Sequence, residues 1–342
     1  MLTIVAPAEG AGQPPPGGPL AAPPLSPPFR DVVLDRPNLA SARASATART
    51  RRYPVGDGRG RSVAISVTAA CRATCQVAAP QRIADFLGTL AHGDEMSLLN
   101  VEMNTRSQIS ASCGGGAHAC YFAGINRMLI VGNGSPAEDG APRRFVIAHE
   151  YGHHLAQHRR APALHSPAID WGTLRWARYE RICQGRRKRR YFPGNQRLHY
   201  FRNPGEAFAE AFAFNRFRGA RVKWAWSSSL KPDAGAFAAI RADVGSPWPG
   251  RSTSGFSRRL SGGRLATHSI PTPLDGTVTL RLGDPRASQF ELRLFDRSGR
   301  LLRAGRGGGA LRFDVCGQAG LRAEVRRLTR GAGRYRLTVR TP

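Results

Sequence analysis

The sequence contains very little lysine and no long apolar segment. Only three of its 51 basic residues are lysines, namely Lys188, Lys223 and Lys231. No uninterrupted apolar run approaches the ~20 residues that a membrane-spanning helix needs, so we expect no transmembrane segment. The net charge of +28 ordinarily suggests a nucleic-acid partner. A GC-rich coding sequence, however, produces arginine in place of lysine, beside abundant alanine, glycine and proline, in any protein. We therefore expect no specific nucleic-acid partner.

The six cysteines include no C-x-x-C pair, the spacing typical of many structural zinc sites. An even number of cysteines without this spacing suits disulfide bonds in an exported protein. Cys113 and Cys120 flank a run of three glycines and form the local pair that we predict. The other pairings stay open, and in a cytoplasmic protein the same residues would be buried thiols.

Residues 1–61 are predicted to form a disordered leader rich in proline and glycine, because such a composition buries too little apolar surface to fold. The first eight residues resemble the end of a secretory signal peptide, an apolar stretch that runs into an A-x-A cleavage site. We therefore expect an extracellular protein whose signal peptide is truncated or begins upstream of this start. An ordinary cytoplasmic N-terminus is the alternative.

The rest of the chain divides into two regions of different periodicity. Residues 62–245 begin with strand-like segments and continue with helix-like ones, which predicts an α+β domain. The expected strands are 63–68, 97–103 and 119–131, and the expected helices are 80–91, 144–159, 171–183 and 204–217. A Pro/Ser/Gly-rich linker follows at 246–264. Apolar residues alternate with polar ones over 265–342, which predicts a small all-β sandwich.

The pattern H-E-x-x-H stands inside one predicted helix. His149 and His153 are a little over one helical turn apart, so both imidazoles project from one face and can bind a single Zn²⁺. Glu150 is rotated by ~100° from His149, which directs its carboxylate beside the metal, where it can take a proton from water. Gly152 costs the helix ~1 kcal/mol relative to alanine, which indicates that another backbone passes close by. The alternative is a surface helix that carries two histidines by chance.

A third metal ligand is expected on the helix that begins at Asn203. Glu206 and Glu210 are four residues apart on one face of this helix, among phenylalanines, and two such carboxylates are destabilising unless a cation neutralises them. We predict that Glu206 binds zinc and that Glu210 holds an imidazole N–H from behind. Alternatively, Glu206 forms a capping box with Asn203 and Glu210 is solvated.

These motifs resemble those of the gluzincins, zinc metallopeptidases with H-E-x-x-H followed by a ligand glutamate on a second helix. H-E-Y-G-H together with G-E-A-F-A-E is similar to the branch that contains the catalytic domain of anthrax lethal factor. It is still more similar to secreted metallopeptidases of GC-rich bacteria, in which an A-C-Y strand, here residues 119–121, precedes the active helix. The resemblance covers roughly residues 110–245 and implies a zincin-like fold.

The resemblance also implies roles for individual residues. Zinc would be bound by His149, His153 and Glu206, with Glu150 as general base and proton shuttle. The substrate would be a protein or peptide whose backbone adds to an edge strand near Met128–Val131. Tyr200 would stabilise the oxyanion, although it lies six residues before the ligand glutamate and the adjacent His199 is an alternative.

The remaining features carry less information. The C-terminal module resembles the pre-peptidase C-terminal β-domains of secreted proteases, which implies a role in export or substrate attachment; a purely structural role is the alternative. The basic run 186–190 could bind an anionic cell-surface polymer, and a solvated loop is the alternative. His154 and His158 are predicted to be ordinary groups on a helix surface.

Taken together, the sequence predicts a secreted, monomeric zinc metalloendopeptidase. The rival is a non-catalytic adhesion or cell-wall-binding protein with a relic zincin domain. Such a relic would have no reason to keep Glu150, which binds no metal but is needed for turnover. A peptidoglycan amidase stays open as well, because zinc ligands alone do not determine which bond is cleaved.

Overall fold

The computed structural model describes residues 30–33, 50–75, 80–132, 143–218, 222–283, 289–318 and 320–342. Most of the predicted leader, including the signal-peptide-like start, lies outside these residues. Within the leader the structure differs from the prediction, because β1 (Arg30–Val33) and β2 (Arg51–Pro54) are strands. Pairing explains both: β1 lies parallel to β5 (Ala117–Phe122), and β2 is antiparallel to β3 (Ser62–Val67).

These strands belong to a six-stranded sheet with the order β1-β5-β6-β4-β3-β2. Its central strands β3, β4 (Asn100–Asn104) and β6 (Arg127–Val131) run parallel, and β5 runs antiparallel to β6. Alternate side chains of β5 enter two cores, because helices cover both faces of the sheet. Helix α4 (Arg106–Cys113) lies on one face, whereas α3 (Pro80–Gly88) and α5 (Arg143–Gln157) lie on the other.

The expectation of a substrate-binding edge strand at Met128–Val131 is wrong. These residues belong to β6, which has β5 on one side and β4 on the other. The backbone groups of β6 are therefore paired within the sheet and cannot accept a further strand. In the described part of the chain, the edges of this sheet are β1 and β2.

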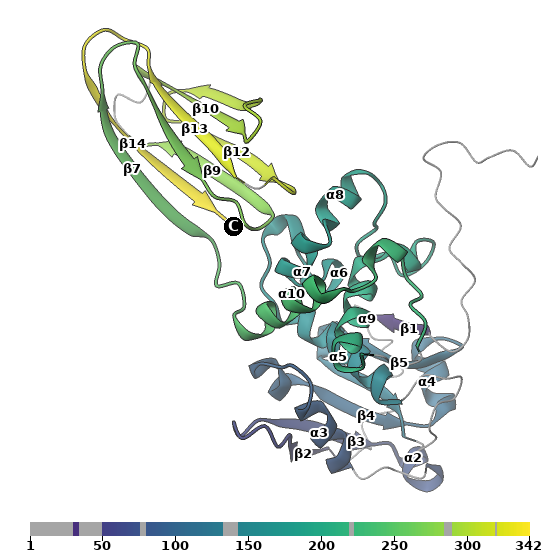
Figure 1. Ribbon diagram of the computed structural model, residues 1–342. Helices are drawn as coiled ribbons and strands as arrows, with labels where there is room; N and C mark the ends of the chain where they lie inside the picture. The colour runs from purple at the N-terminus through teal and green to yellow at the C-terminus, as the bar shows by residue number, and fades with distance from the viewer. Residues whose placement is uncertain are drawn as a thin grey trace, which may run out of the picture.

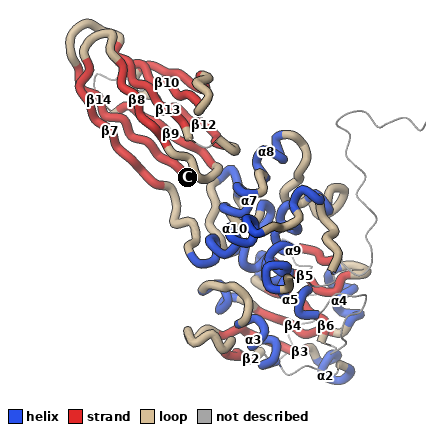
Figure 2. The backbone as a smooth tube through the Cα atoms, viewed as in Figure 1, coloured by secondary structure: helices blue, strands red, loops and turns tan. Residues whose placement is uncertain are grey.

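A set of helices follows the sheet in the chain and packs beside it (Figures 1 and 2). It comprises α6 (Ala168–Trp171), α7 (Leu174–Tyr179), α8 (Ile182–Arg187), α9 (Pro204–Arg216) and α10 (Ala234–Gly245). The single helix predicted at 171–183 is wrong, because Gly172 and Arg181 adopt positive φ angles of 78° and 55°. These turns divide the segment into three short helices and direct Trp176 onto Phe208 of α9.

Residues 252–341 form two four-stranded antiparallel sheets that pack face to face. One sheet contains β8 (Leu265–Ile270), β10 (Phe290–Asp296), β11 (Leu301–Arg306) and β13 (Leu321–Arg327); the other contains β7 (Ser252–Leu260), β9 (Gly276–Leu282), β12 (Ala310–Val315) and β14 (Gly333–Thr341). The predicted fold class, α+β followed by a small β-sandwich, is confirmed. The predicted linker differs from the structure, since β7 lies within 246–264 and pairs along its whole length with β14.

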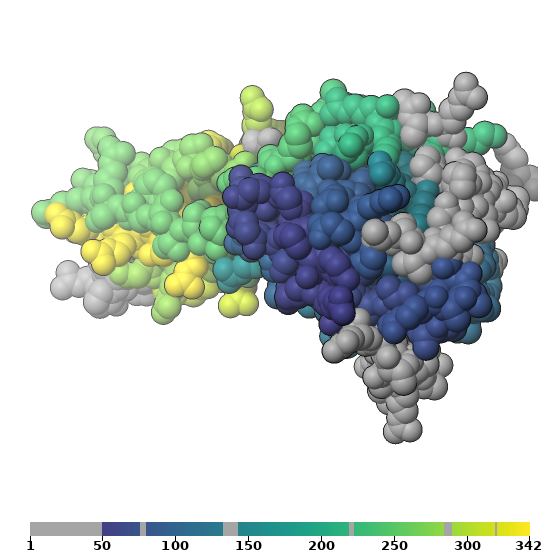
Figure 3. All heavy atoms as spheres, turned by 90° about the horizontal axis from the view of Figure 1, so that it is seen from below, coloured from purple at the N-terminus to yellow at the C-terminus, as the bar shows by residue number. Residues whose placement is uncertain are grey.

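Three disulfide bonds form among the described residues, and one of them connects the two parts. Cys113 pairs with Cys120, as predicted, and the other bonds join Cys71 to Cys75 and Cys183 to Cys316. The last of these ties α8 to the sandwich, which projects as an elongated lobe from the α+β part (Figures 1 and 3). No helix among the described residues is both long and apolar enough to cross a membrane.

Candidate metal centre

Two crossing helices, α5 and α9, position the candidate site. Gly152 of α5 lies where the helices meet, since a Cβ atom at this position would stand 2.8 Å from the Cα atom of Ala209 in α9. This is the close backbone that the glycine in the motif indicates. Asn203 caps the start of α9, where its side chain accepts a hydrogen bond from the Gly205 N–H, and Pro204 follows in the first helical position. The crossing brings the H-E-x-x-H motif and the two glutamates of α9 together.

Three buried side chains converge between these helices. The Nε2 atoms of His149 and His153 are 3.1 Å apart, and Glu206 Oε2 lies 3.6 Å from the first and 3.3 Å from the second. Four ligand atoms placed tetrahedrally at 2.0–2.1 Å from an ion are separated by about 3.3 Å from one another. The three donor atoms fit this spacing, and the group could hold a metal ion.

Glu210 orients one of these imidazoles. Its Oε2 lies 2.9 Å from His149 Nδ1, on the side of the ring opposite to Nε2. A carboxylate only accepts hydrogen bonds, so Nδ1 carries a proton and Nε2 is the ring nitrogen left to face the other two donor atoms. Carboxylate groups behind ligand histidines commonly fix ring orientation and tautomer in this way.

Glu150 and Tyr200 complete the predicted set. Glu150 is fully buried on α5 next to His149, and its carboxylate is not one of the three converging groups. Tyr200 begins the short 3-10 helix η6 (Tyr200–Arg202) and donates its hydroxyl to Glu206 Oε2 at 3.3 Å. The alternative, His199, stacks on Phe192 with ring centroids 3.7 Å apart. Of these two adjacent residues, Tyr200 is the one that contacts a member of the triangle.

Sequence reasoning missed two residues that contact the group. Gln196 donates from Nε2 to Glu206 Oε1 at 2.8 Å. The indole of Trp226 stacks on the His149 ring, with centroids 5.6 Å apart and an interplanar angle of 29°. Both lie in irregular segments, one before and one after α9 in the chain, where no periodicity predicts which way a side chain points. An amide ten residues before the ligand glutamate is too weak a sequence signal to single out.

The prediction that His154 and His158 are surface groups is wrong for His154, which is fully buried. His154 Nδ1 accepts from the Tyr121 hydroxyl of β5 at 2.9 Å, and Nε2 donates to the Glu95 carbonyl at 2.8 Å. Burial lowers the pKa of His154 to about 3, so the ring is neutral at ordinary pH. His154 therefore anchors α5 to the sheet, whereas the half-buried His158 contacts Asn126.

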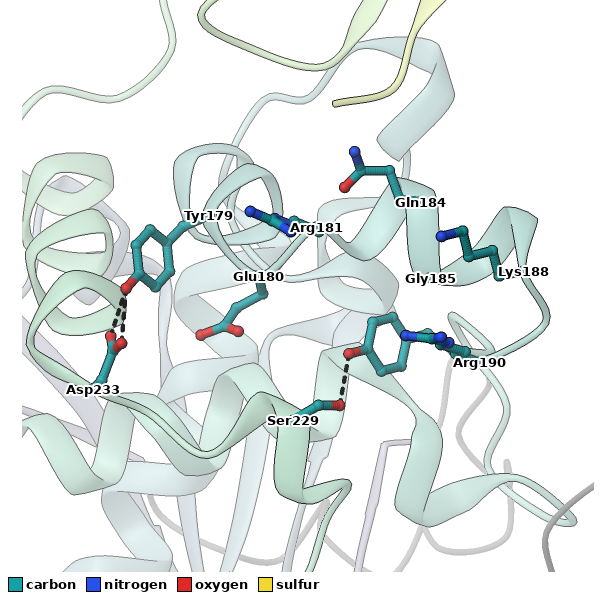
Figure 4. Close-up of a pocket in the computed structure, with 10 residues that line it drawn as sticks. Tyr179, Glu180, Arg181, Gln184, Gly185, Lys188, Arg190, Ser229 and Asp233 are labelled. Atoms are coloured by element: carbon teal, nitrogen blue, oxygen red, sulfur yellow. Dashed lines mark hydrogen bonds between the residues drawn. The ribbon is translucent and has the colours of Figure 1, made fainter. Parts of the chain in front are cut away.

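Two other features of the described residues could be taken for functional sites. His165, Cys183 and Asp275 lie close enough to share an ion, but Cys183 is bonded to Cys316 and has no thiolate to offer. A cavity of about 610 Å³ lies between α7, α8 and the start of α10 (Figure 4). Burial, and then the charge of Asp233, raises the pKa of Glu180 in this cavity to about 7. Lys188 and Arg190 of the basic run 186–190 line it, whereas none of the predicted catalytic or metal-binding residues does.

No family model and no curated protein matches the chain. Solved structures match about a quarter of it. The periplasmic inhibitor PliG of g-type lysozyme from Aeromonas hydrophila is 13% identical over 26% of this chain and 86% of its own, with a TM-score of 0.24. The pre-peptidase C-terminal domain of a Bacillus anthracis collagenase is 16% identical over 25% of this chain and 88% of its own, with a TM-score of 0.22. The SPBc2 prophage-derived protein YomS is 12% identical over 26% of this chain and 94% of its own, with a TM-score of 0.20. Similarities of this size assign neither a family nor a function to the chain.

Proposed function

We propose that this protein is a zinc-dependent metallopeptidase that hydrolyses peptide bonds with Glu150 as general base. The observation that carries the proposal is the triangle of His149 Nε2, His153 Nε2 and Glu206 Oε2, with sides of 3.1 to 3.6 Å. Two imidazoles and one carboxylate are a donor set of catalytic zinc sites, which keep a fourth position open. The Glu210 contact supports it, because it holds His149 in the tautomer that a metal requires.

The chemistry of the proposed reaction divides between the metal and the chain. A bound zinc ion would supply Lewis acidity towards water and the peptide carbonyl. Glu150 would accept a proton from the attacking water and return it to the leaving amine. The Tyr200 hydroxyl, which donates to Glu206 Oε2 in this structure, can rotate to donate to the oxyanion, a contribution of about 3 kcal/mol.

We also propose that the enzyme acts outside the cell on protein or peptide substrates. Its disulfide bonds support this location, because such bonds persist in oxidising compartments. The C-terminal sandwich would then accompany the catalytic part as an appended module, as the sequence resemblance implies.

The test compares the parent with Glu150→Gln, which keeps the size of the side chain and removes its basicity. Zinc content per chain and hydrolysis of casein are measured with and without a chelator. We expect both proteins to bind one zinc ion per chain and the variant to lose at least about a hundredfold in rate. Glu324→Gln, a matched change on β13 of the sandwich, should leave the rate unchanged.

Two results would reject the proposal. One is equal chelator-insensitive cleavage by the parent and by Glu150→Gln, and the other is a parent protein that binds no zinc. Zinc binding without hydrolysis of casein, but with release of peptides from cell-wall fragments, would favour the amidase instead. Zinc binding without either activity would favour the non-catalytic adhesion protein.

A further inference from the structure

We infer that Gln196 is a positioning residue that keeps Glu206 a one-oxygen metal ligand and thereby leaves the fourth coordination position open. The inference rests on the metal centre of the proposed function. It concerns a side chain that belongs neither to the metal ligands nor to the proposed acid–base groups.

The two carboxylate oxygens of Glu206 have different partners. Oε2 lies 3.3 and 3.6 Å from the two imidazole Nε2 atoms and accepts from the Tyr200 hydroxyl at 3.3 Å, whereas Oε1 accepts from the Gln196 amide at 2.8 Å. Glu206 is fully buried, so water does not compete for Oε1. A hydrogen bond on the outer oxygen fixes the rotation of the carboxylate and opposes the approach of that oxygen to the ion. Without this bond, both oxygens could bind the metal and fill the position that a catalytic site must keep open.

The orientation of the amide is determined by its partner. A carboxylate cannot donate, so the NH₂ group of Gln196 must face Glu206 and the amide oxygen must point away from it. This oxygen is buried and has no hydrogen-bond partner among the described residues. An unpaired buried acceptor disfavours folding, and an apolar side chain of similar size would avoid that cost. The amide of Gln196 is therefore explained by the hydrogen bond that its NH₂ group donates to Glu206, and not by a contribution to the stability of the loop.

The loop that carries Gln196 is held against the same helix as Glu206. Asn203 Oδ1, at the start of α9, accepts from the Gly194 N–H at 3.2 Å as well as from Gly205. A second hydrogen bond spans Gln196, because Asn195 Oδ1 accepts from the His199 N–H at 2.9 Å. The loop is closed further by the Phe192 N–H, which donates to the carbonyl of Arg202 at 3.0 Å. Gln196 is thus pre-positioned before any metal binds.

The test uses Gln196→Met, which keeps the length of the side chain and removes the donor. Gln157→Met, at the end of α5, is the matched control. Zinc affinity is measured by competition with a chromophoric chelator, and the geometry of the site is read from the visible absorption spectrum of the Co²⁺-loaded protein. We expect Gln196→Met to bind zinc about 10- to 100-fold more weakly than the parent. Its Co²⁺ absorption should also weaken, because five-coordinate Co²⁺ absorbs less than tetrahedral Co²⁺.

A second variant separates positioning from loss of the fold. Gln196→Asn keeps an amide whose donor stops about 1.5 Å short of Glu206, so it should lose zinc affinity like the methionine variant. The metal-free forms of both variants should unfold at temperatures no lower than that of the parent. Parent-like zinc affinity and Co²⁺ spectrum in Gln196→Met would overturn the inference while leaving the proposed function intact. A parent that binds neither ion would overturn both.

Discussion

Two of the three candidate ligands use one polar atom for a neighbour and present the other to the centre. His149 donates from Nδ1 to Glu210 and presents Nε2, and Glu206 accepts on Oε1 from Gln196 and presents Oε2. Hydrogen bonds on the far side of each group, where a metal would not compete, therefore help to orient it, and the Tyr200 hydroxyl adds a contact to Oε2 of Glu206 itself. This division is the one that the proposed metal site requires.

The buried His165, which is not part of the candidate metal centre, allows a test of stability as a function of pH. His165 is fully buried and stacks on Trp171 with centroids 4.7 Å apart. Burial lowers its pKa from 6.5 to about 4, and the charges of Arg178 and Arg186 act in the same direction, against that of Asp275. Between pH 6.5 and 4 the unfolded chain therefore binds more protons than the folded one. Stability should fall as the pH decreases through this window, by up to about 3 kcal/mol from this residue.

The variant His165→Phe isolates this contribution, because it keeps an aromatic ring against Trp171 and removes the titrating group. The measurement is the free energy of unfolding in denaturant at pH 7.5 and at pH 4.5. The parent should lose about 2 to 3 kcal/mol more than the variant between these two conditions. Other buried histidines, such as His154, titrate in both proteins and cancel in the comparison. Equal losses in the two proteins would contradict the assignment.

Spacing within one helix was sufficient to predict which site residues share a face, but not what lies opposite that face. His149 and His153 follow from helical geometry, and Glu206 follows from two carboxylates that need a cation. Gln196 and Trp226 reach the centre from loops, whose paths depend on contacts made elsewhere in the chain. His154 was misjudged for a related reason, since its partners Tyr121 and Glu95 come from other elements.

At the scale of elements, the centre depends on how closely α5 and α9 approach. A methyl group at Gly152 would lie 2.8 Å from the Cα atom and 3.1 Å from the carbonyl oxygen of Ala209. Both are backbone atoms, so relief requires the helices to move apart. Gly152→Ala should lower stability by roughly 1 to 3 kcal/mol, even though alanine is the better helix former. Zinc affinity should fall as well, because the two helices carry different ligands.

Gly245→Ala, at the end of α10, is the matched control, since a Cβ atom at this position meets nothing within 4 Å. Here the helix propensity of alanine acts alone, and stability should stay the same or rise by up to about 1 kcal/mol. Thermal unfolding and zinc titration of both variants provide the measurement. Stabilisation by Gly152→Ala with unchanged zinc affinity would show that the helix contact does not position the site.

Elements with strong periodicity were predictable, and those that depend on local backbone conformation or distant pairing were not. The α5 and α9 helices and the alternating strands of the sandwich follow from their patterns. The division of 171–183 depends on positive φ angles at Gly172 and Arg181. An arginine in the sequence does not indicate a positive φ angle. Strand β7 is rich in serine, threonine and arginine and looks like a linker until β14 pairs with it.

At the scale of the whole molecule, a few contacts join the α+β part to the sandwich. Arg178 of α7 binds Asp275 at the start of β9, and Arg187 donates to the carbonyl of Asp314 at 3.2 Å. The disulfide between Cys183 and Cys316 lies in the same region. The change of periodicity along the chain predicted the α+β part and the sandwich but not this link, because six cysteines allow fifteen pairings and sequence alone does not choose among them.

The Cys183–Cys316 bond should be the more stabilising of two disulfides that differ in loop length. Its cysteines are 133 residues apart, whereas Cys113 and Cys120 are 7 apart. A cross-link stabilises by restricting the unfolded chain, by about 5 kcal/mol for the long loop and about 2.5 kcal/mol for the short one. Replacing each pair by serines and measuring the free energy of unfolding tests the order of the two effects. A larger loss for the short loop would contradict it.

The same bond determines whether the two parts separate when the chain between them is cut. A specific protease site inserted between Ser246 and Pro247, which are both exposed, would sever the connector without touching either core. Under denaturing conditions without reductant, the cleaved parent should run as one species, because Cys183 still holds Cys316. With reductant, or in Cys316→Ser, the two fragments should run apart. Separation of the parent fragments without reductant would show that this cross-link does not form, and the sandwich would then be tethered to the α+β part by the chain and its polar contacts alone.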